Sequence, residues 1–64
     1  MRKKCVDVHR VDGNKYLGRA LISVPLYYRF VAKYGFKASE LLSKKQRERL
    51  SVKPDARIFL SSTN

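Results

Sequence analysis

The sequence predicts an α+β fold, a single small domain over residues 1–64 of order β-β-α-α-β with an N-terminal β-hairpin. Three observations predict it. Residues 4–11 and 15–24 alternate between apolar and polar side chains, the period of a half-buried strand. After Pro25, apolar residues recur at spacings of three and four, the period of a helix. Residues 56–62 (ARIFLSS) alternate again and predict a final strand, with Ile58 and Leu60 on one face.

The first two strands are predicted to form a hairpin. Its turn lies at Asp12, Gly13 and Asn14, because Gly and Asn tolerate positive φ. Gly18 inside the second strand predicts a bulge or a close backbone approach. One face of the second strand is predicted to carry Ala20, Ile22 and Val24, and the other Arg19, Leu21 and Ser23.

Two helices are expected between the hairpin and the last strand. Pro25 suits a first helical turn, where its missing N–H costs nothing, and Gly35 is a good C-terminal stop. A second helix is predicted from an N-cap at Ser39 to Leu50, with few apolar residues and many Lys and Arg. Residues 53–55 should form a turn, and residues 62–64 should fray.

Charge is the strongest compositional signal. Fifteen Lys and Arg stand against five Asp and Glu, giving a formal net charge of +10. The chain is 44% hydrophobic and has three Phe and four Tyr, enough to form a core rather than a disordered basic tail. A folded, strongly cationic domain attracts polyanions. The expected partner is nucleic acid, and the alternatives are an anionic membrane surface or an acidic protein.

The small size of the chain limits what else it can be. A domain of 64 residues buries only about 60% of its unfolded surface, so we expect a homodimer to supply further buried area. Cys5 is the single cysteine, and with His9 it falls short of a zinc site, so no disulfide, metal or cofactor is expected. No apolar run approaches the ~20 residues of a membrane span, and no apolar segment follows the basic start. We therefore predict a cytoplasmic protein with no membrane partner.

An enzyme is not expected. Asp7 and His9 share a strand face and could form an acid–base pair, but a working site also needs a pocket and a third group. A surface pair on a strand is the simpler interpretation. The sequence carries no phosphate-binding loop and no nucleotide-binding fingerprint.

Basic side chains near the turn and on the first helix are the candidate nucleic-acid contacts. Arg10, Lys15 and Arg19 flank the hairpin turn and could reach phosphates, while Arg29 and Lys33 lie one helical turn apart and should point the same way. Each could equally be an ordinary solvated charge. Helical spacing predicts Tyr27 and Tyr34 in the core or at a dimer interface, and it leaves Tyr16 and Tyr28 as candidates for exposed rings.

Residues 11–25 (VDGNKYLGRALISVP), followed by a short helix and GFKASE, resemble the swapped-hairpin regulators of the AbrB/MazE type. Gly18 and Arg19 match that family's Gly-Arg step, and Val24 and Pro25 stand where it has Ile-Pro. The resemblance implies an interlocked homodimer with Arg19 as a DNA contact. The strand after Gly-Arg is two residues longer than the family pattern, and the predicted helix over 39–50 has no counterpart in it.

Residues 19–25 (RALISVP) and 37–50 (KASELLSKKQRERL) also resemble the ribbon-helix-helix family. That resemblance implies a dimeric ribbon in the major groove, with Arg19, Leu21 and Ser23 as the residues that read bases. The mostly charged second helix departs from the family, as do the first eighteen residues.

These observations predict a small basic DNA-binding protein, a transcriptional regulator that contacts duplex phosphates and the major groove through its hairpin. One alternative is a protein that binds RNA or single strands and stacks bases on Tyr16 and Tyr28. Another is an inhibitor or adaptor that docks on an acidic surface of a larger enzyme. A preference for unpaired strands would favour the first alternative, and a tight complex with one acidic protein the second.

Overall fold

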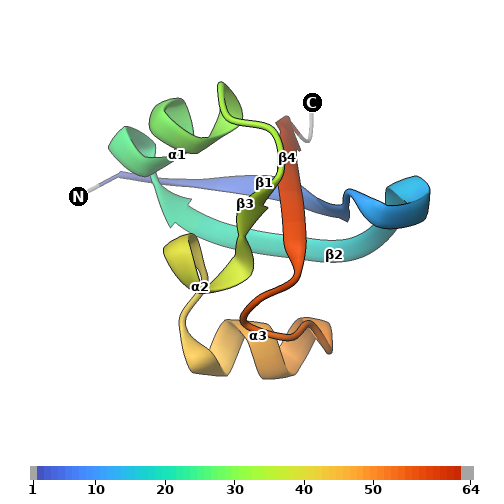
Figure 1. Cartoon of the computed structure of the whole chain (residues 1–64). Helices are drawn as coiled ribbons and strands as arrows, with labels where there is room; N and C mark the ends of the chain where they lie inside the picture. Colours follow the sequence, from blue (N-terminus) through green and yellow to red (C-terminus); the bar gives the residue numbers. More distant parts are fainter. Residues whose placement is uncertain (1, 63–64) are drawn as a thin grey trace.

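The described part of the chain contains four antiparallel strands and three short α-helices (Figure 1). The computed structural model describes residues 2–62. Its elements are β1 (Lys3–Arg10), β2 (Lys15–Ser23), α1 (Val24–Val31), β3 (Phe36–Lys37), α2 (Ala38–Leu41), α3 (Lys44–Leu50) and β4 (Arg57–Ser62). The predicted α+β class, the N-terminal hairpin and the final strand are confirmed. Ser62 belongs to β4, and the other two residues of the predicted frayed end lie outside the described residues.

The sheet has a buried inner face and an open outer face. Its strand order is β2-β1-β4-β3, and β1 pairs with both β2 and β4. Alternate residues of these strands are buried on the inner face. Together with four residues from the segment that carries α1, β3 and α2, they form the core: Val6, Val8, Ala20, Ile22, Phe30, Phe36, Ala38, Leu42, Ile58 and Leu60. In Figure 1, α1 and α2 lie on one side of β4 and α3 lies below the sheet. The other alternate positions of β1, β2 and β4 therefore form the outer face.

The hairpin turn takes the predicted conformation. Residues 12–14 form a single short turn of 3₁₀ helix, η1 (Asp12–Asn14), in which Gly13 has φ 73° and Asn14 has φ 51°. Both angles lie in the left-handed region that Gly and Asn tolerate best. These residues therefore reverse the chain with little strain.

Gly18 marks both a bulge and a close contact. Val8 pairs with Gly18, but His9 pairs with Tyr16, so Leu17 is an extra residue on β2. Gly18 has φ 144°, and a Cβ placed there would lie 2.6 Å from Cδ2 of Leu50 on α3. The predicted bulge is confirmed, and the group that lies close to Gly18 is the Leu50 side chain rather than a backbone segment.

The first helix is shorter than predicted. It ends at Val31, with Ala32 as C-cap, and the chain then leaves the helix before reaching Gly35. Tyr34 consequently does not follow the helical period and is 69% exposed, so it does not lie in the core, and its predicted alternative place at a dimer interface stays a prediction. Tyr27 does pack against the core, as predicted, and Tyr16 and Tyr28 are exposed, as predicted.

The predicted single helix from Ser39 to Leu50 is also wrong. Leu42 and Ser43 are extended and separate α2 from α3. Ser43 caps α3, because its Oγ accepts the backbone N–H of Gln46 at 3.3 Å and its own N–H donates to Gln46 Oε1 at 3.1 Å. The break lets Leu42 reach the core, where it is 2% exposed. Phe36 and Lys37, which precede α2, form β3 against β4.

Side chains of α3 cover the free edge of β2. Gln46 Nε2 donates to the carbonyl oxygen of Leu21 at 3.1 Å, and the Arg49 guanidinium donates to that of Arg19 at 3.0 Å. A strand from another chain could pair here only by displacing both side chains. Within residues 2–62, no helix is long and apolar enough to cross a membrane.

Candidate nucleic-acid interface

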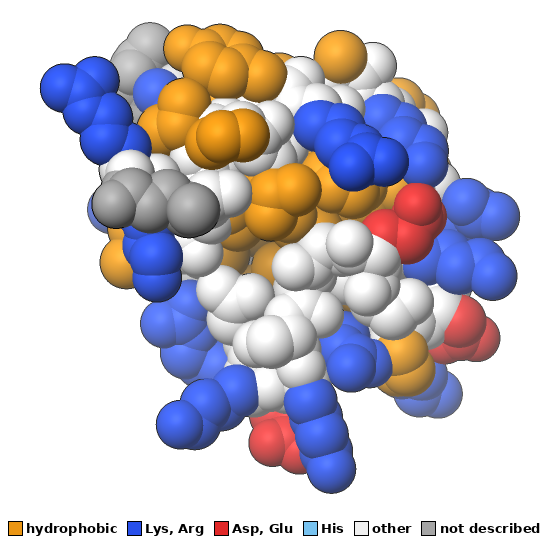
Figure 2. All heavy atoms as spheres, turned by 90° about the vertical axis from the view of Figure 1, so that its left-hand side faces the viewer, with side chains coloured by type: hydrophobic (Ala, Val, Ile, Leu, Met, Phe, Trp, Pro, Cys, Tyr) orange, Lys and Arg blue, Asp and Glu red, His pale blue; other side chains and the backbone are white. Residues whose placement is uncertain are grey.

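The positive charge of the protein lies on its surface. No charged side chain within residues 2–62 is buried. In the same range, ion pairs join Arg10 to Asp12 at 3.9 Å, Arg19 to Asp7 at 3.6 Å and Lys33 to Glu40 at 3.0 Å. Figure 2, seen from the side of α1 and α2, shows Lys and Arg side chains around the rim of that face, with apolar side chains between them. Most of the net charge of +10 therefore faces solvent without a carboxylate partner.

The three predicted hairpin contacts fall into two places. Arg10 and Lys15 are register partners beside the turn. Arg19 lies beyond the bulge on the outer face, opposite Asp7. The hairpin thus presents one cationic pair at its tip and a separate arginine on the sheet.

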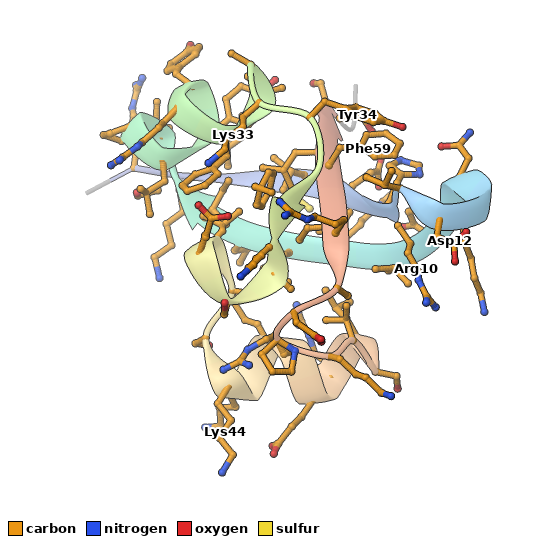
Figure 3. All side chains as sticks on the ribbon, viewed as in Figure 1. Arg10, Asp12, Lys33, Tyr34, Lys44 and Phe59 are labelled. Carbon is orange, nitrogen blue, oxygen red and sulfur yellow. The ribbon has the colours of Figure 1, made fainter. Side chains whose placement is uncertain are left out.

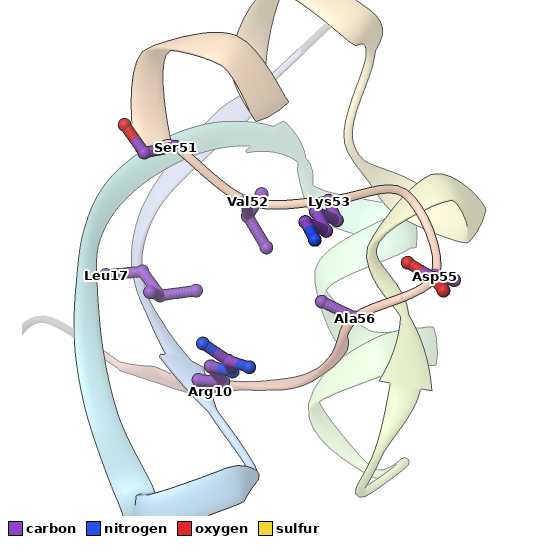
Figure 4. Close-up of a pocket in the computed structure, with 7 residues that line it drawn as sticks. All are labelled: Arg10, Leu17, Ser51, Val52, Lys53, Asp55 and Ala56. Atoms are coloured by element: carbon purple, nitrogen blue, oxygen red, sulfur yellow. The ribbon is translucent and has the colours of Figure 1, made fainter.

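Arg10 also lines a pocket of about 400 Å³ between β2 and the segment joining α3 to β4 (Figure 4). Its lining residues are Arg10, Leu17, Ser51, Val52, Lys53, Asp55 and Ala56. Two cationic groups and the Ser51 hydroxyl are suited to a phosphate oxygen, although Asp55 offsets part of their charge. Lys53 had no sequence signal that set it apart from the other lysines.

Arg29 and Lys33 both lie near the Phe30 ring, although Lys33 is not on the helix predicted to carry both. The Arg29 guanidinium carbon is 5.8 Å, and Lys33 Nζ is 5.9 Å, from the centroid of the Phe30 ring. Lys33 lies just beyond the end of α1 and is bound by Glu40. Arg29 is therefore the more available of the two for an outside anion.

Glu40 links this cationic pair to the start of α2. Its Oε2 accepts the backbone N–H of Lys37 at 2.8 Å, and its Oε1 accepts from Lys33 Nζ at 3.0 Å. The Lys37 N–H and then the Lys33 ammonium hold the pKa of Glu40 below its usual range. A carboxylate with a lowered pKa stabilises the fold above its unfolded pKa of about 4.3 and loses that contribution as the pH falls through its folded pKa.

We therefore expect E40Q to be less stable than the wild type at pH 7 and the two proteins to converge below about pH 4. Thermal unfolding followed by circular dichroism from pH 7 to pH 2.5 measures this difference. E48Q is the control, because it raises the net charge by the same amount on exposed α3. If E48Q shows the same pH-dependent difference from the wild type, net charge rather than the Glu40 contacts is responsible.

Four aromatic rings form a continuous line across the outer face, here termed the aromatic row: Tyr16 of β2, His9 of β1, Phe59 of β4 and Tyr34 of the α1–β3 loop. Successive ring centroids are 5.4, 5.0 and 4.9 Å apart, and the last two pairs are stacked. Tyr16 and Tyr34 at the ends are 52% and 69% exposed, while the two central rings are half-buried. Figure 3 shows Tyr34 beside Phe59 next to β4.

Polar contacts hold the aromatic row in place. His9 Nε2 and Ser61 Oγ are 3.0 Å apart, and the Tyr16 hydroxyl donates to Asp7 Oδ1 at 3.3 Å. The Arg57 guanidinium donates to the carbonyl oxygen of Gly35 at 2.8 Å and so ties down the loop that carries Tyr34. Each end of the row is therefore positioned by a side chain from a neighbouring element.

These contacts also bear on the catalytic and metal-binding alternatives. Asp7 contacts Tyr16 and Arg19, whereas His9 forms a hydrogen bond with Ser61. None of these contacts joins Asp7 to His9 as an acid–base pair. Within residues 2–62, no three His, Cys, Asp or Glu side chains gather into a possible metal site. The outer face is thus an aromatic and cationic surface.

No protein family model, curated protein or solved structure matches this chain. The two family resemblances therefore remain predictions.

Proposed function

We propose that this protein binds nucleic acid. The observation that carries the proposal is the net charge of +10 on a folded domain whose described charged side chains all reach the surface. Such a field attracts polyanions and supports contacts to phosphates that do not depend on sequence. The proposed contacts include all five residues expected from the sequence: Arg10, Lys15, Arg19, Arg29 and Lys33.

The specific form predicted from the sequence is a homodimeric regulator that grips duplex DNA with its hairpin. The register pairing of Arg10 and Lys15 at the tip supports this form. Since α3 covers the edge of β2, a dimer is better placed on another surface. Leu26, Tyr28 and Val31 of α1 are exposed and offer an apolar one.

Fluorescence anisotropy tests the proposal with a labelled 20-base random duplex and its single strand at 50 mM salt. The mass of the free protein, measured alongside, gives its oligomeric state. We expect binding to at least one form with a Kd of about 10⁻⁶ M or tighter at this low salt. Polyglutamate is the control, and it should compete poorly. Absence of binding to both nucleic acids, or equal competition by polyglutamate, would overturn the proposal.

A further inference from the structure

The aromatic row ends in a ring that is stacked on one side and open on the other. Tyr34 packs against Phe59 with centroids 4.9 Å apart and an interplanar angle of 26°. Despite this contact it is 69% exposed, so its second face meets water. The stack of Phe59 and Tyr34 therefore offers a free surface on which one more planar ring can be added.

The row is not required to build the core. The buried residues of β1, β2 and β4 all lie on the inner face, and the row lies on the outer one. Exposed, mutually stacked aromatic side chains on an otherwise open sheet face suit a ligand with flat, apolar faces. Nucleobases have such faces and stack on Tyr, Phe and His in a manner that tolerates any base.

Two cations near the row suit a phosphate backbone. Arg19 and Arg57 occupy outward positions on β2 and β4. Lys15 pairs with Arg10 at the hairpin tip, in register with the inward positions of β1. Asp7 also points outward, but the Tyr16 hydroxyl and the Arg19 guanidinium both contact its Oδ1. A strand that stacks a base on the open face of Tyr34 would therefore have Arg57 close by, since Arg57 is bonded to the neighbouring Gly35, and Arg19 further along the same face.

We propose that the aromatic row is a stacking platform for unpaired bases, and hence that single-stranded nucleic acid is the preferred ligand class. This inference rests on the proposed nucleic-acid binding, which would stand without it if duplex DNA were the ligand. In a duplex each base face is covered by its neighbours, so ring stacking of this kind requires an unpaired strand.

The test compares Y34A with Y28A. Tyr28 on α1 is 68% exposed, nearly the same as Tyr34, but its ring neighbour is Tyr27 rather than a member of the row. Binding is measured to a ten-base oligothymidylate, to an abasic ten-mer with the same phosphates, and to a duplex. For oligothymidylate, Y34A should bind about tenfold more weakly than the wild type, and Y28A should match the wild type. All three proteins should bind the abasic strand equally.

Two further substitutions separate stacking from bulk. Y34W should keep the wild-type affinity for oligothymidylate, because its ring can stack, whereas Y34L should behave like Y34A. Circular dichroism checks that each variant is folded. Equal binding of oligothymidylate and the abasic strand by the wild type, or an equal loss on both strands in Y34A, would overturn the stacking platform. Either result leaves the proposed nucleic-acid binding intact. Absence of binding to every probe would contradict both nucleic-acid binding and the stacking platform.

Discussion

Raising the salt concentration from 50 to 200 mM is expected to weaken duplex binding about a thousandfold if about six phosphates are contacted, and single-strand binding about three-hundredfold. Each neutralised phosphate releases condensed counterions, and that gain disappears as salt is added. The prediction follows from surface cations that largely lack carboxylate partners. Anisotropy titrations at four salt concentrations give the slope of log Kd against log salt.

Matched variants show which cations contribute to that slope. K15Q should reduce it by about one, whereas K44Q should leave it unchanged. Both remove one charge, but Lys15 lies at the hairpin tip beside Arg10, and Lys44 lies on α3, at the opposite end of the molecule from Tyr34 in Figure 3. Y34A should raise Kd at every salt concentration without changing the slope of log Kd against log salt, because stacking releases no counterions. A flat salt dependence, or equal effects of K15Q and K44Q, would contradict a localised phosphate interface.

G18A is expected to be the most destabilising of the glycine substitutions. The φ of 144° is a conformation that L-residues rarely adopt, and such strain costs about 1–3 kcal/mol. The new methyl group would also force Leu50 away from the sheet. Since 1 kcal/mol shifts Tm by about 4–8 °C in a domain of this size, we expect a decrease of roughly 10 °C or more by thermal denaturation.

G13A is the control for this prediction. Gly13 also has a positive φ, of 73°, but a Cβ there would meet nothing within 4 Å, so its cost should be about 1 kcal/mol. Measuring G18A in an L50A background separates the steric cost from the cost of backbone strain. G18A should destabilise the protein less when the Leu50 side chain is absent. If G18A is no worse than G13A, or if L50A leaves its cost unchanged, the tight packing of α3 on β2 is not the cause.

Local signals predicted the elements whose causes are local. The turn residues Gly13 and Asn14, the proline at the start of α1 and the alternation in β1, β2 and β4 each act within a few residues. The break between α2 and α3 had a local signal too, since Ser43 and Gln46 have the spacing of a capping box. Burial of Leu42 in the core requires an extended chain there, which interrupts the helix predicted over 39–50.

The aromatic row could not be predicted, because it depends on pairing between distant segments. His9 and Phe59 meet through the register of β1 with β4, and His9 meets Tyr16 through a register shifted by the bulge. Helical periodicity gave the wrong position for Tyr34. A spacing of four residues from Phe30 places two side chains on one face only within a helix, and α1 ends at Val31. The sequence identified the cations and the exposed Tyr16, but not their neighbours.

NMR titration of ¹⁵N- and ¹³C-labelled protein with ten-base oligothymidylate is the decisive test of binding at the outer face of the sheet. We expect shift changes concentrated at Tyr16, His9, Phe59 and Tyr34 and at the outward positions of β1, β2 and β4. The resonances of α1 around Tyr28 and of α3 around Lys44 should change little. Changes confined to those helices, or no changes at millimolar oligonucleotide, would contradict binding at the outer face of the sheet.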